Sequence, residues 1–379
     1  MRILFFTASR SWTGNERVFA ATARGLSQRG HTVTYACAAD SLIERRLDHT
    51  SYEILPIASG SFLFQVLRLR RALEGRFIEA ILVSSERDHV VAALAARIAE
   101  RATIIRRIPH EQPLQDGRRE RIAMRLAHSS LLFASDYERR QTPGPFRPVE
   151  TTVVSLGVDV REHDAQRAAG STALGVPEGS RLIVCVHDIG SRARAATVLR
   201  VVAMLAPLHA DLRLALIGPG SDSQDLRMHA AALRIAGIVS FLGEREDYLQ
   251  CLRAADLGWV VASGDSAAFA VLDFSALRVP LVLDRSLLAQ QYMADGITGV
   301  LLAPGDTSDN AAAVARLLAH DDERSAMGNA ARARVDREFE EGAMIDGFER
   351  SIVSAGKRSR WVGGKAASAP AVGAEVETV

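Results

Sequence analysis

The chain has 379 residues, of which 48% are hydrophobic and 24% charged, and its formal net charge at pH 7 is +1. These values indicate a globular protein of about two domains. No apolar run reaches the roughly 18 residues that a membrane-spanning helix needs, which excludes a chain built on such helices. Aromatic residues make up only 6% of the chain and do not alternate with basic ones, so nucleic-acid binding is not supported.

The first half of the chain alternates short apolar runs with helical segments. Its apolar start is predicted to be a buried strand, because polar Thr7 and Ser9 follow too soon for a signal peptide. A long helix is predicted at residues 18–29. Strands are predicted at residues 3–6, 31–36, 53–57, 80–84, 103–105, 130–134 and 152–155.

The second half repeats this pattern after a polar segment rich in small residues, 161–180, where a domain boundary is expected. Strands are predicted at residues 181–186, 212–217, 238–242, 257–261, 281–283 and 300–302. Helices are predicted at residues 195–206, 247–255, 309–319 and 322–339.

Alternating strands and helices are typical of parallel sheets that helices cover on both faces. The fold class is therefore predicted to be α/β, with two Rossmann-like, doubly wound domains and a cleft between the carboxyl ends of their sheets. The expected boundaries are 1–160 for the N-terminal domain and 161–335 for the C-terminal domain. Residues 336–358 are expected to form a helix that packs back on the N-terminal domain, and 359–379 a disordered tail.

Charge is unevenly distributed: residues 1–160 contain 23 Arg against 17 acidic residues. One interpretation is a compositional bias toward Arg, and Phe62 and Leu63 then belong to an ordinary packed helix. The other is a basic face, centred on residues 62–64 and 68–71, that contacts anionic lipid as a peripheral membrane surface. Cys37, Cys185 and Cys251 lack metal-ligand spacing and are expected as small core residues in a reducing cytoplasm.

Two acidic residues lie in the part of the second half where the predicted strands and helices are clearest. Asp265 is expected at the end of the strand ahead of a loop, and Asp273 follows eight residues later in the helix that this loop opens. A carboxylate just past a strand, followed by a helix N-terminus, is where open α/β sheets place polar ligands. The alternatives are a helix N-cap for Asp265 and a solvated helix acid for Asp273.

A series of short motifs, in order along the chain, resembles family 4 of the glycosyltransferases, which have the GT-B fold and use sugar nucleotides with retention of configuration. The match is better in the second half than in the first. The motifs are GNERV at residues 14–18, SLGVD at 155–159, LIGPG at 216–220, LG at 242–243, YLQCLRAAD at 248–256, DSAAFAVLDFSALRVP at 265–280, DGITGVL at 295–301, PGD at 304–306 and MGNAAR at 327–332.

The cysteines indicate a cytoplasmic location, and the basic N-terminal domain adds peripheral contact to the inner face of the membrane as a further expectation. The resemblance implies an enzyme. It implies a nucleotide-diphosphate sugar as donor, a glycan or lipid-linked acceptor, and no metal or other cofactor. Asp265 takes the place of the acid that approaches the donor sugar, and Asp273 that of the acid that binds the ribose. The donor-binding set is completed by Gly218, Gly220, Leu242, Ser266, Ala267 and Phe269.

Several residues depart from the family pattern around the diphosphate. Asp188 and Ala193 stand where the family has an Arg and a Lys, and Leu287 and Leu288 replace two glycines. An acid at that place repels a diphosphate. Two nearby residues offer compensation: either Arg192 or Arg194 reaches the phosphates after a small loop shift, or both are solvated loop residues.

In the first domain, Gly14, Glu16 and Arg17 are assigned to the loop on the acceptor side. The family carries a histidine near the reaction centre, and the nearest candidate is His110, a few residues late in the chain. His187 is a second candidate, beside Asp188. The spacing of the residues supports no Ser-His-Asp, Cys-His or metal-binding pattern.

The sequence thus leaves two functions open. One is transfer of a sugar from a nucleotide-diphosphate donor to a cell-envelope or polysaccharide acceptor, with Asp265 and His110 as catalytic candidates. The other is a GT-B-shaped protein that has lost donor chemistry and acts as a binding or scaffolding subunit. Retention of both acids favours the first, and loss of the cations and glycines favours the second.

Overall fold

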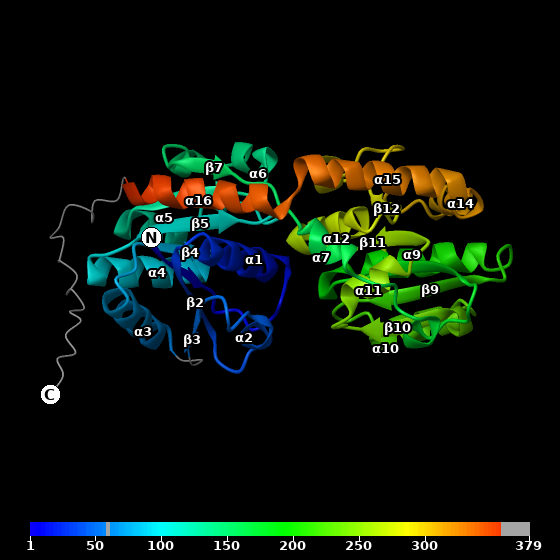
Figure 1. Cartoon of the computed structure of the whole chain (residues 1–379), viewed down its shortest axis with the longest axis horizontal. Helices are drawn as coiled ribbons and strands as arrows, with labels where there is room; N and C mark the ends of the chain where they lie inside the picture. Colours follow the sequence, from blue (N-terminus) through cyan, green and yellow to red (C-terminus); the bar gives the residue numbers. More distant parts are fainter. Residues whose placement is uncertain (58–60, 358–379) are drawn as a thin grey trace, which may run out of the picture.

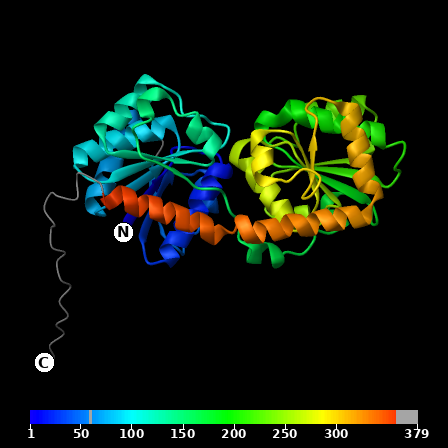
Figure 2. The same ribbon diagram turned by 90° about the horizontal axis from the view of Figure 1, so that it is seen from above.

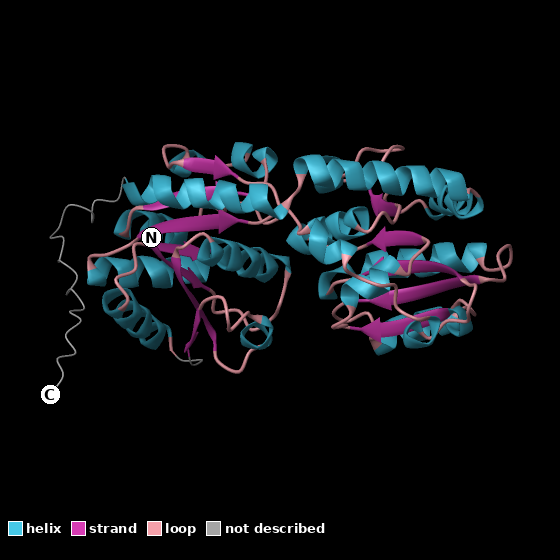
Figure 3. Ribbon diagram, in the orientation of Figure 1, coloured by secondary structure: helices cyan, strands magenta, loops and turns pink. Residues whose placement is uncertain are grey.

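Two parallel β-sheets organise the chain, each with helices on both faces (Figure 1, Figure 3). The computed structural model describes residues 1–57 and 61–357; the tail that the sequence predicts to be disordered lies outside these ranges. The first sheet has the strand order β3-β2-β1-β4-β5-β6-β7. Its strands are β1 (Arg2–Phe6), β2 (Thr32–Ala38), β3 (Glu53–Ile57), β4 (Ala80–Val83), β5 (Thr103–Ile108), β6 (Ser129–Phe133) and β7 (Thr151–Val153).

The second sheet has the strand order β10-β9-β8-β11-β12-β13. Its strands are β8 (Arg181–Val186), β9 (Leu212–Ile217), β10 (Val239–Gly243), β11 (Leu257–Val260), β12 (Leu281–Asp284) and β13 (Val300–Leu302). In both sheets the order reverses beside the first strand, between β1 and β4 and between β8 and β11. These are the switch points at which doubly wound sheets leave a crevice for ligands. The predicted α/β class with two Rossmann-like domains is confirmed.

In the N-terminal domain, α3, α4 and α5 pack together on one face of the sheet, and α1 and α16 cover the other. The helices are α1 (Gly14–Gln28), α2 (Leu42–Arg46), α3 (Phe62–Gly75), α4 (Glu86–Ala99), α5 (Arg118–Leu126), α6 (Asp136–Arg140) and α16 (Glu341–Lys357), with a 3₁₀ turn, η1 (Gly144–Phe146).

In the C-terminal domain, α9, α10 and α14 pack on one face, and α11, α12, α13 and α15 lie on the other. The helices are α7 (Val160–Asp164), α8 (Ser171–Leu174), α9 (Arg192–Leu205), α10 (Gln224–Ala232), α11 (Tyr248–Arg253), α12 (Gly264–Ala276), α13 (Leu287–Tyr292), α14 (Thr307–Ala319) and α15 (Asp321–Glu338). Two 3₁₀ turns complete it, η2 (Ile189–Ser191) and η3 (Ala236–Ile238).

The chain crosses between the domains at two neighbouring places. The first crossing follows β7, and the second joins α15, on the C-terminal domain, to α16, on the N-terminal domain (Figure 2). Backbone hydrogen bonds tie the crossings together: the Val158 amide donates to Phe339 O at 2.9 Å, and the Glu341 amide donates to Val158 O at 3.1 Å. The return helix of the sequence prediction therefore corresponds to α16.

The start of α1 lies directly against the start of α12, so the two domains share one continuous cluster of buried apolar side chains. A Cβ atom on Gly14 would lie 2.4 Å from the backbone carbon of Asp265. Only glycine permits this approach. The Gly14 amide also donates to Ser266 Oγ at 3.0 Å across the boundary.

Four strands have the bounds that the sequence predicts: β3, β8, β9 and β13. Two predictions are wrong in a way that bears on function. Strand β5 continues through Arg106 and Arg107 instead of ending at Ile105, because both arginines are buried and paired with acids. The predicted loop over residues 266–269 is instead part of α12, which begins at Gly264 and includes Asp265 in its first turn.

Helix α15 packs closely on the C-terminal end of α12, and this contact generates a stability prediction. An added Cβ at Gly328 would lie 2.0 Å from the Arg278 carbonyl oxygen, which is backbone and cannot rotate away. We expect Gly328→Ala to lower the free energy of unfolding by about 1–3 kcal/mol. Gly342→Ala, which meets no atom within 4 Å in α16, is the matched control and should not destabilise. Urea denaturation measures both; equal stability of the two variants would contradict the packing.

Candidate functional site

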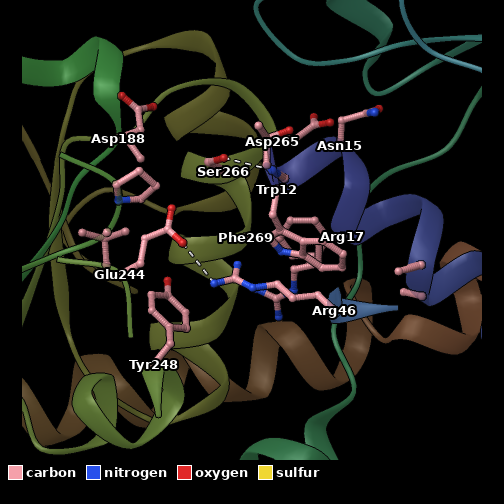
Figure 4. A pocket seen from close by; sticks show the side chains of 18 of the residues that line it. Trp12, Asn15, Arg17, Arg46, Asp188, Glu244, Tyr248, Asp265, Ser266 and Phe269 are labelled. Atoms are coloured by element: carbon pink, nitrogen blue, oxygen red, sulfur yellow. Dashed lines mark hydrogen bonds and ion pairs between the residues drawn. The ribbon is translucent and has the colours of Figure 1, made fainter. Parts of the chain in front are cut away.

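A cleft of about 1130 Å³ opens between the domains, at the carboxyl ends of both sheets (Figure 4). The segments that line it follow β1, β5, β8, β9 and β11, which include strands at both switch points. The architecture therefore brings together loops that are far apart in the sequence, as the sequence predicts for two doubly wound domains.

Asp265 lies at the base of this cleft and is almost fully buried. Its carboxylate accepts from Arg107 Nη1 at 2.5 Å and from the backbone amide of His110 at 3.1 Å. Burial alone raises the pKa of a carboxyl group, but here the charge of Arg107 and the hydrogen bond from His110 outweigh it and hold the pKa of Asp265 well below its ordinary value. Asp265 is thus an anion, bound by two groups of the other domain.

The side chain of His110 connects Asp265 to Tyr292. Nδ1 of the imidazole lies 2.8 Å from Asp265 Oδ1, and Nε2 lies 3.2 Å from the Tyr292 hydroxyl. The Leu156 amide donates to that hydroxyl at 3.3 Å, so the hydroxyl donates its own proton to Nε2. This network assigns the Nδ1–H tautomer, in which His110 donates to Asp265. The structure brings both catalytic candidates together.

Asp273 is fully buried on the next turns of α12 and does not line the cleft. Arg17 donates to its two oxygens at 2.6 and 2.8 Å, and His163 Nε2 lies 2.8 Å from Oδ1. Burial acts to raise the pKa of Asp273, but the charge of Arg17 outweighs it and lowers the value to about 2. Arg17 and His163 occupy the oxygens of Asp273 in this structure, so ribose binding by Asp273, which stays a prediction, requires an exchange of partners.

The amides at the start of α12 are also occupied by protein carboxylates. Asp188 Oδ2 accepts from the Ser263 amide and from its hydroxyl, both at 2.6 Å. Glu111 Oε2 accepts from the Gly264 amide at 2.8 Å. A helix N-terminus is a ready site for an anion. Here two side-chain anions, one from each domain, already fill that role.

The charges that line the cleft are mostly acidic. Ten acidic side chains line it, against five arginines, among the residues that the structure describes. Four of these arginines form ion pairs: Arg17 with Asp273, Arg24 with Glu341, Arg46 with Glu244, and Arg245 with Asp247. The Arg46–Glu244 pair spans the two domains at the cleft (Figure 4). Arg10 donates to the carbonyl oxygens of Ala39 and Asp40.

The structure separates the expected site residues into two groups. One group lines the cleft: Asp265, His110, Gly14, Arg17, Gly218, Ser266 and Phe269. The other does not: Asp273, Arg192, Arg194, Gly220, Ala267, Leu242 and Glu16. Glu16 instead closes a capping box with Thr13 at the start of α1, and Ala267 is buried in α12.

Contact of Arg192 or Arg194 with the phosphates, one of the two alternatives for these residues, stays a prediction. Arg192 is 66% exposed and pairs with Asp225 at 2.5 Å, and neither arginine lines the cleft. Both lie at the start of α9, after the 3₁₀ turn η2. The turn is fixed by hydrogen bonds between Ser191 Oγ and the backbone of Asp188. Both arginines are nevertheless close enough to His187 to act on it electrostatically.

The two leucines at the start of α13 behave differently from one another. Leu288 is buried, as expected of a packing residue, but Leu287 is 53% exposed. Ser286 caps this helix by accepting from the Ala289 amide at 3.0 Å. Neither leucine lines the cleft, so they do not plug it.

Three site residues were not identified from the sequence: Arg107, Tyr292 and His163. Arg107 carried a signal, because two adjacent arginines in an otherwise apolar parallel strand imply buried, paired charges. Tyr292 and His163 carried none, since each meets its partner only through the tertiary fold. Among the described residues, no group of three or more His, Cys, Asp and Glu side chains is arranged to hold a metal ion.

With this geometry in view, comparison with known proteins shows which family the C-terminal domain is similar to. Residues 167–334 match the family model "Glycosyl transferases group 1". The C-terminal domain is thus similar to the group 1 glycosyl transferases. The predicted resemblance to glycosyltransferases is confirmed at this level, while membership of family 4 and retention of configuration stay predictions.

Curated relatives of this domain carry glycosyltransferase names. The lipopolysaccharide core biosynthesis glycosyltransferase LpsE of Rhizobium meliloti is 24% identical over 187 residues, which cover 49% of this chain and 54% of LpsE. The D-inositol 3-phosphate glycosyltransferase of Corynebacterium jeikeium is 30% identical over 189 residues, 46% of this chain and 45% of the relative. The chain thus spans about half the length of the curated relatives that it matches.

Solved structures extend the likeness in fold to both domains. Anabaena HepE, in complex with UDP and glucose, superposes with a TM-score of 0.79 at 18% identity, covering 93% of this chain and 100% of HepE. A glycosyltransferase from Rickettsia africae gives a TM-score of 0.78 at 14% identity, covering 94% and 99%. At these identities the likeness shows the GT-B fold alone. No helix in the described part of the chain is both long enough and apolar enough to cross a bilayer.

The buried Asp273 cluster generates a prediction about acid stability. The pKa of Asp273 falls from 3.8 to about 2 on folding, so its contribution to stability is present above pH 4 and is lost as the pH falls toward 2. The pKa of His163 is raised, because Asp273 outweighs the effect of burial, so its contribution is present below pH 6.5 and is lost as the pH rises through the folded value.

We expect Asp273→Asn to lower the free energy of unfolding by about 3 kcal/mol at pH 5, because it leaves buried partners uncompensated. Its stability should also fall less steeply than that of the unaltered protein between pH 4 and pH 2. Asp322→Asn, at an exposed position of α15, is the control and should change stability by less than about 0.5 kcal/mol. Urea denaturation across this pH range measures both. Parallel pH profiles for Asp273→Asn and the unaltered protein would contradict the assignment.

Proposed function

We propose that this protein is a glycosyltransferase that moves a sugar from a nucleotide-diphosphate donor to a cell-envelope or polysaccharide acceptor. The observation that carries the proposal is the Asp265–His110 pair, held where the switch-point loops of two Rossmann-like domains face one another. Donor and acceptor are supported by the likeness to HepE, a structure with UDP and glucose, and to LpsE, named for lipopolysaccharide core biosynthesis.

In the proposed reaction the donor sugar lies above Asp265 and His110. An acceptor hydroxyl attacks the anomeric carbon on the face from which the diphosphate departs, so configuration is retained. The hydroxyl proton passes to the departing phosphate oxygen, and the glycosidic bond to the diphosphate breaks. His110 is oriented by Asp265 and Tyr292. Once the Tyr292 hydroxyl no longer donates to Nε2 of His110, this nitrogen accepts a hydrogen bond from a sugar hydroxyl.

The departing diphosphate needs a cation, and Arg17 is the best placed. Its guanidinium lines the cleft, stacks on the Phe269 ring at 4.2 Å and is 28% exposed. When Arg17 turns toward a phosphate, His163 still compensates Asp273. Arg17 can therefore exchange partners without leaving a buried charge alone.

Donor binding and its dependence on Arg17 can be tested together. Titration with UDP, GDP and their hexose conjugates should raise the thermal unfolding midpoint saturably for at least one donor. Arg17→Gln should reduce kcat/KM by roughly 10- to 100-fold, the worth of a charge-assisted hydrogen bond. Arg192→Gln removes a cation outside the cleft and should leave both readouts unchanged. The proposal fails if no nucleotide or nucleotide sugar stabilises the protein at millimolar concentration.

A second candidate, a binding or scaffolding subunit without donor chemistry, has an observation of its own. Asp265, Asp273 and the amides of Ser263 and Gly264 are all engaged within the protein, and acids outnumber arginines along the cleft. Under this candidate the cleft binds a ligand without turnover. The nucleotide titration distinguishes the two functions, because a scaffold gives no saturable response to any donor.

We further propose that the protein works in the cytoplasm and contacts the inner face of a membrane through α3. Leu63 is 69% exposed, and Phe62, Phe64 and Leu67 are also exposed on this helix. Arg68 lies over the Phe64 ring, 5.0 Å from its centroid, so basic and apolar groups share this surface. Apolar side chains beside arginines are suited to the headgroup region of an anionic bilayer.

The membrane contact predicts a specific loss of vesicle binding. The double variant Leu63→Glu and Leu67→Glu should bind vesicles of phosphatidylcholine and phosphatidylglycerol at least about tenfold more weakly, because it adds negative charge and removes apolar contact. Leu208→Glu, at a position that is 75% exposed on the C-terminal domain, is the control and should bind normally. Co-sedimentation measures all three. Equal binding of the double variant and the control would contradict the proposed membrane contact.

A further inference from the structure

Two adjacent side chains at the end of β8 present hydrogen-bond acceptors without partners. Only 3% of the His187 surface is exposed, yet the residue lines the cleft. Its Nδ1 lies 3.1 Å from the carbonyl oxygen of Pro219, to which it donates, while Nε2 has no partner among the described residues. Burial lowers the pKa of His187, so the ring is neutral at pH 7 and Nε2 is an acceptor.

Asp188 supplies the second acceptor. Its Oδ2 binds the amide and hydroxyl of Ser263, whereas Oδ1 is buried and has no partner in the described structure. Asp188 also lines the cleft (Figure 4). Among the cleft-lining residues that the structure describes, one further buried atom lacks a partner, Tyr52 Oη, which belongs to the N-terminal domain. Buried polar atoms are normally satisfied, so two unsatisfied acceptors on consecutive residues that line one cleft point to a ligand.

The surroundings of this pair favour a hydrogen-bond donor and disfavour an anion. The acids Glu244, Glu246 and Asp247 also line the cleft, and Arg245 is already paired with Asp247. Arg192 and Arg194 act on His187 electrostatically but do not line the cleft. The nearby amides of Ser263 and Gly264 are taken by carboxylates. A phosphate here meets acceptors where it needs donors.

We propose that His187 Nε2 and Asp188 Oδ1 form a subsite for a hydrogen-bond-donating, non-anionic part of a carbohydrate ligand, and that the ammonium group of an amino sugar binds there more tightly than a neutral hydroxyl. The choice of a carbohydrate rests on the proposed function. In this arrangement the loop after β8 binds a sugar, and a diphosphate binds in the part of the cleft that Arg17 and Arg46 line.

Three substitutions test whether the ligand is bound by the two acceptors or only by the overall negative charge of the cleft. His187→Asn keeps a donor to Pro219 O but removes the acceptor at Nε2, and His187→Gln places an amide oxygen near the Nε2 position. Asp188→Asn retains an acceptor for Ser263 and replaces Oδ1 with an NH₂ donor, which reverses the polarity of the subsite. Glu246→Gln, the matched control, removes the same negative charge from the cleft lining without altering either acceptor.

The test uses the full chain with ¹⁵N-labelled histidine and three probes: glucosamine, glucose and inorganic pyrophosphate. Glucosamine should shift the His187 Nε2 signal and bind about tenfold more tightly than glucose. His187→Asn and Asp188→Asn should each weaken glucosamine binding by about tenfold or more, His187→Gln should retain most of it, and Glu246→Gln should change it less than about threefold. Thermal unfolding of each variant confirms that it is folded.

The proposal is overturned if neither sugar shifts the His187 signal, or if pyrophosphate shifts it at lower concentration than glucosamine does. Equal weakening by Glu246→Gln and Asp188→Asn would also overturn it, since the effect would then be one of general charge. Failure here is distinct from failure of the proposed function. Sugar binding at His187 without turnover of any nucleotide sugar supports the subsite and rejects the transferase. Turnover of a nucleotide sugar without a response of the His187 signal supports the transferase and rejects the subsite.

Discussion

Two buried carboxylates on one helix hold the domains of this protein together. Asp265 and Asp273 lie on α12 of the C-terminal domain, and each is bound by an arginine of the N-terminal domain, Arg107 and Arg17. A buried charge without its partner is strongly unfavourable, so opening the domains at this boundary requires another partner for each acid. The close approach of Gly14 to the start of α12 brings these groups within reach of one another.

The same interactions determine what the cleft offers a ligand. Carboxylates from both domains cap the start of α12, and ion pairs engage four of the five arginines that line the cleft, in the part of the chain that the structure describes. A nucleotide donor must therefore exchange partners with the protein when it binds. Arg17 can do so at low cost, because His163 remains beside Asp273. The loop after β8, with His187 and Asp188, instead presents acceptors.

Prediction from the sequence succeeded where the physical signal is local. Apolar runs of three to six residues predicted the strands, four of them with their observed bounds, and the two-domain α/β architecture followed from their alternation with helices. The prediction erred at Ile105 and at residues 266–269. Arg106 and Arg107 are compatible with a buried strand only because distant acids neutralise them, and residues 266–269 lie inside α12, which begins at Gly264.

The sequence by itself determined the class of fold, the two-domain organisation and the choice of Asp265 and His110 as cleft residues, because periodicity and motif spacing act within short stretches of chain. Only the tertiary structure decided what those residues contact. Asp273 is paired with Arg17 and Asp188 caps Ser263, and these partners lie 256 and 75 positions apart in the chain. Whether a charge is free or paired depends on such distant neighbours, and sequence spacing does not contain them.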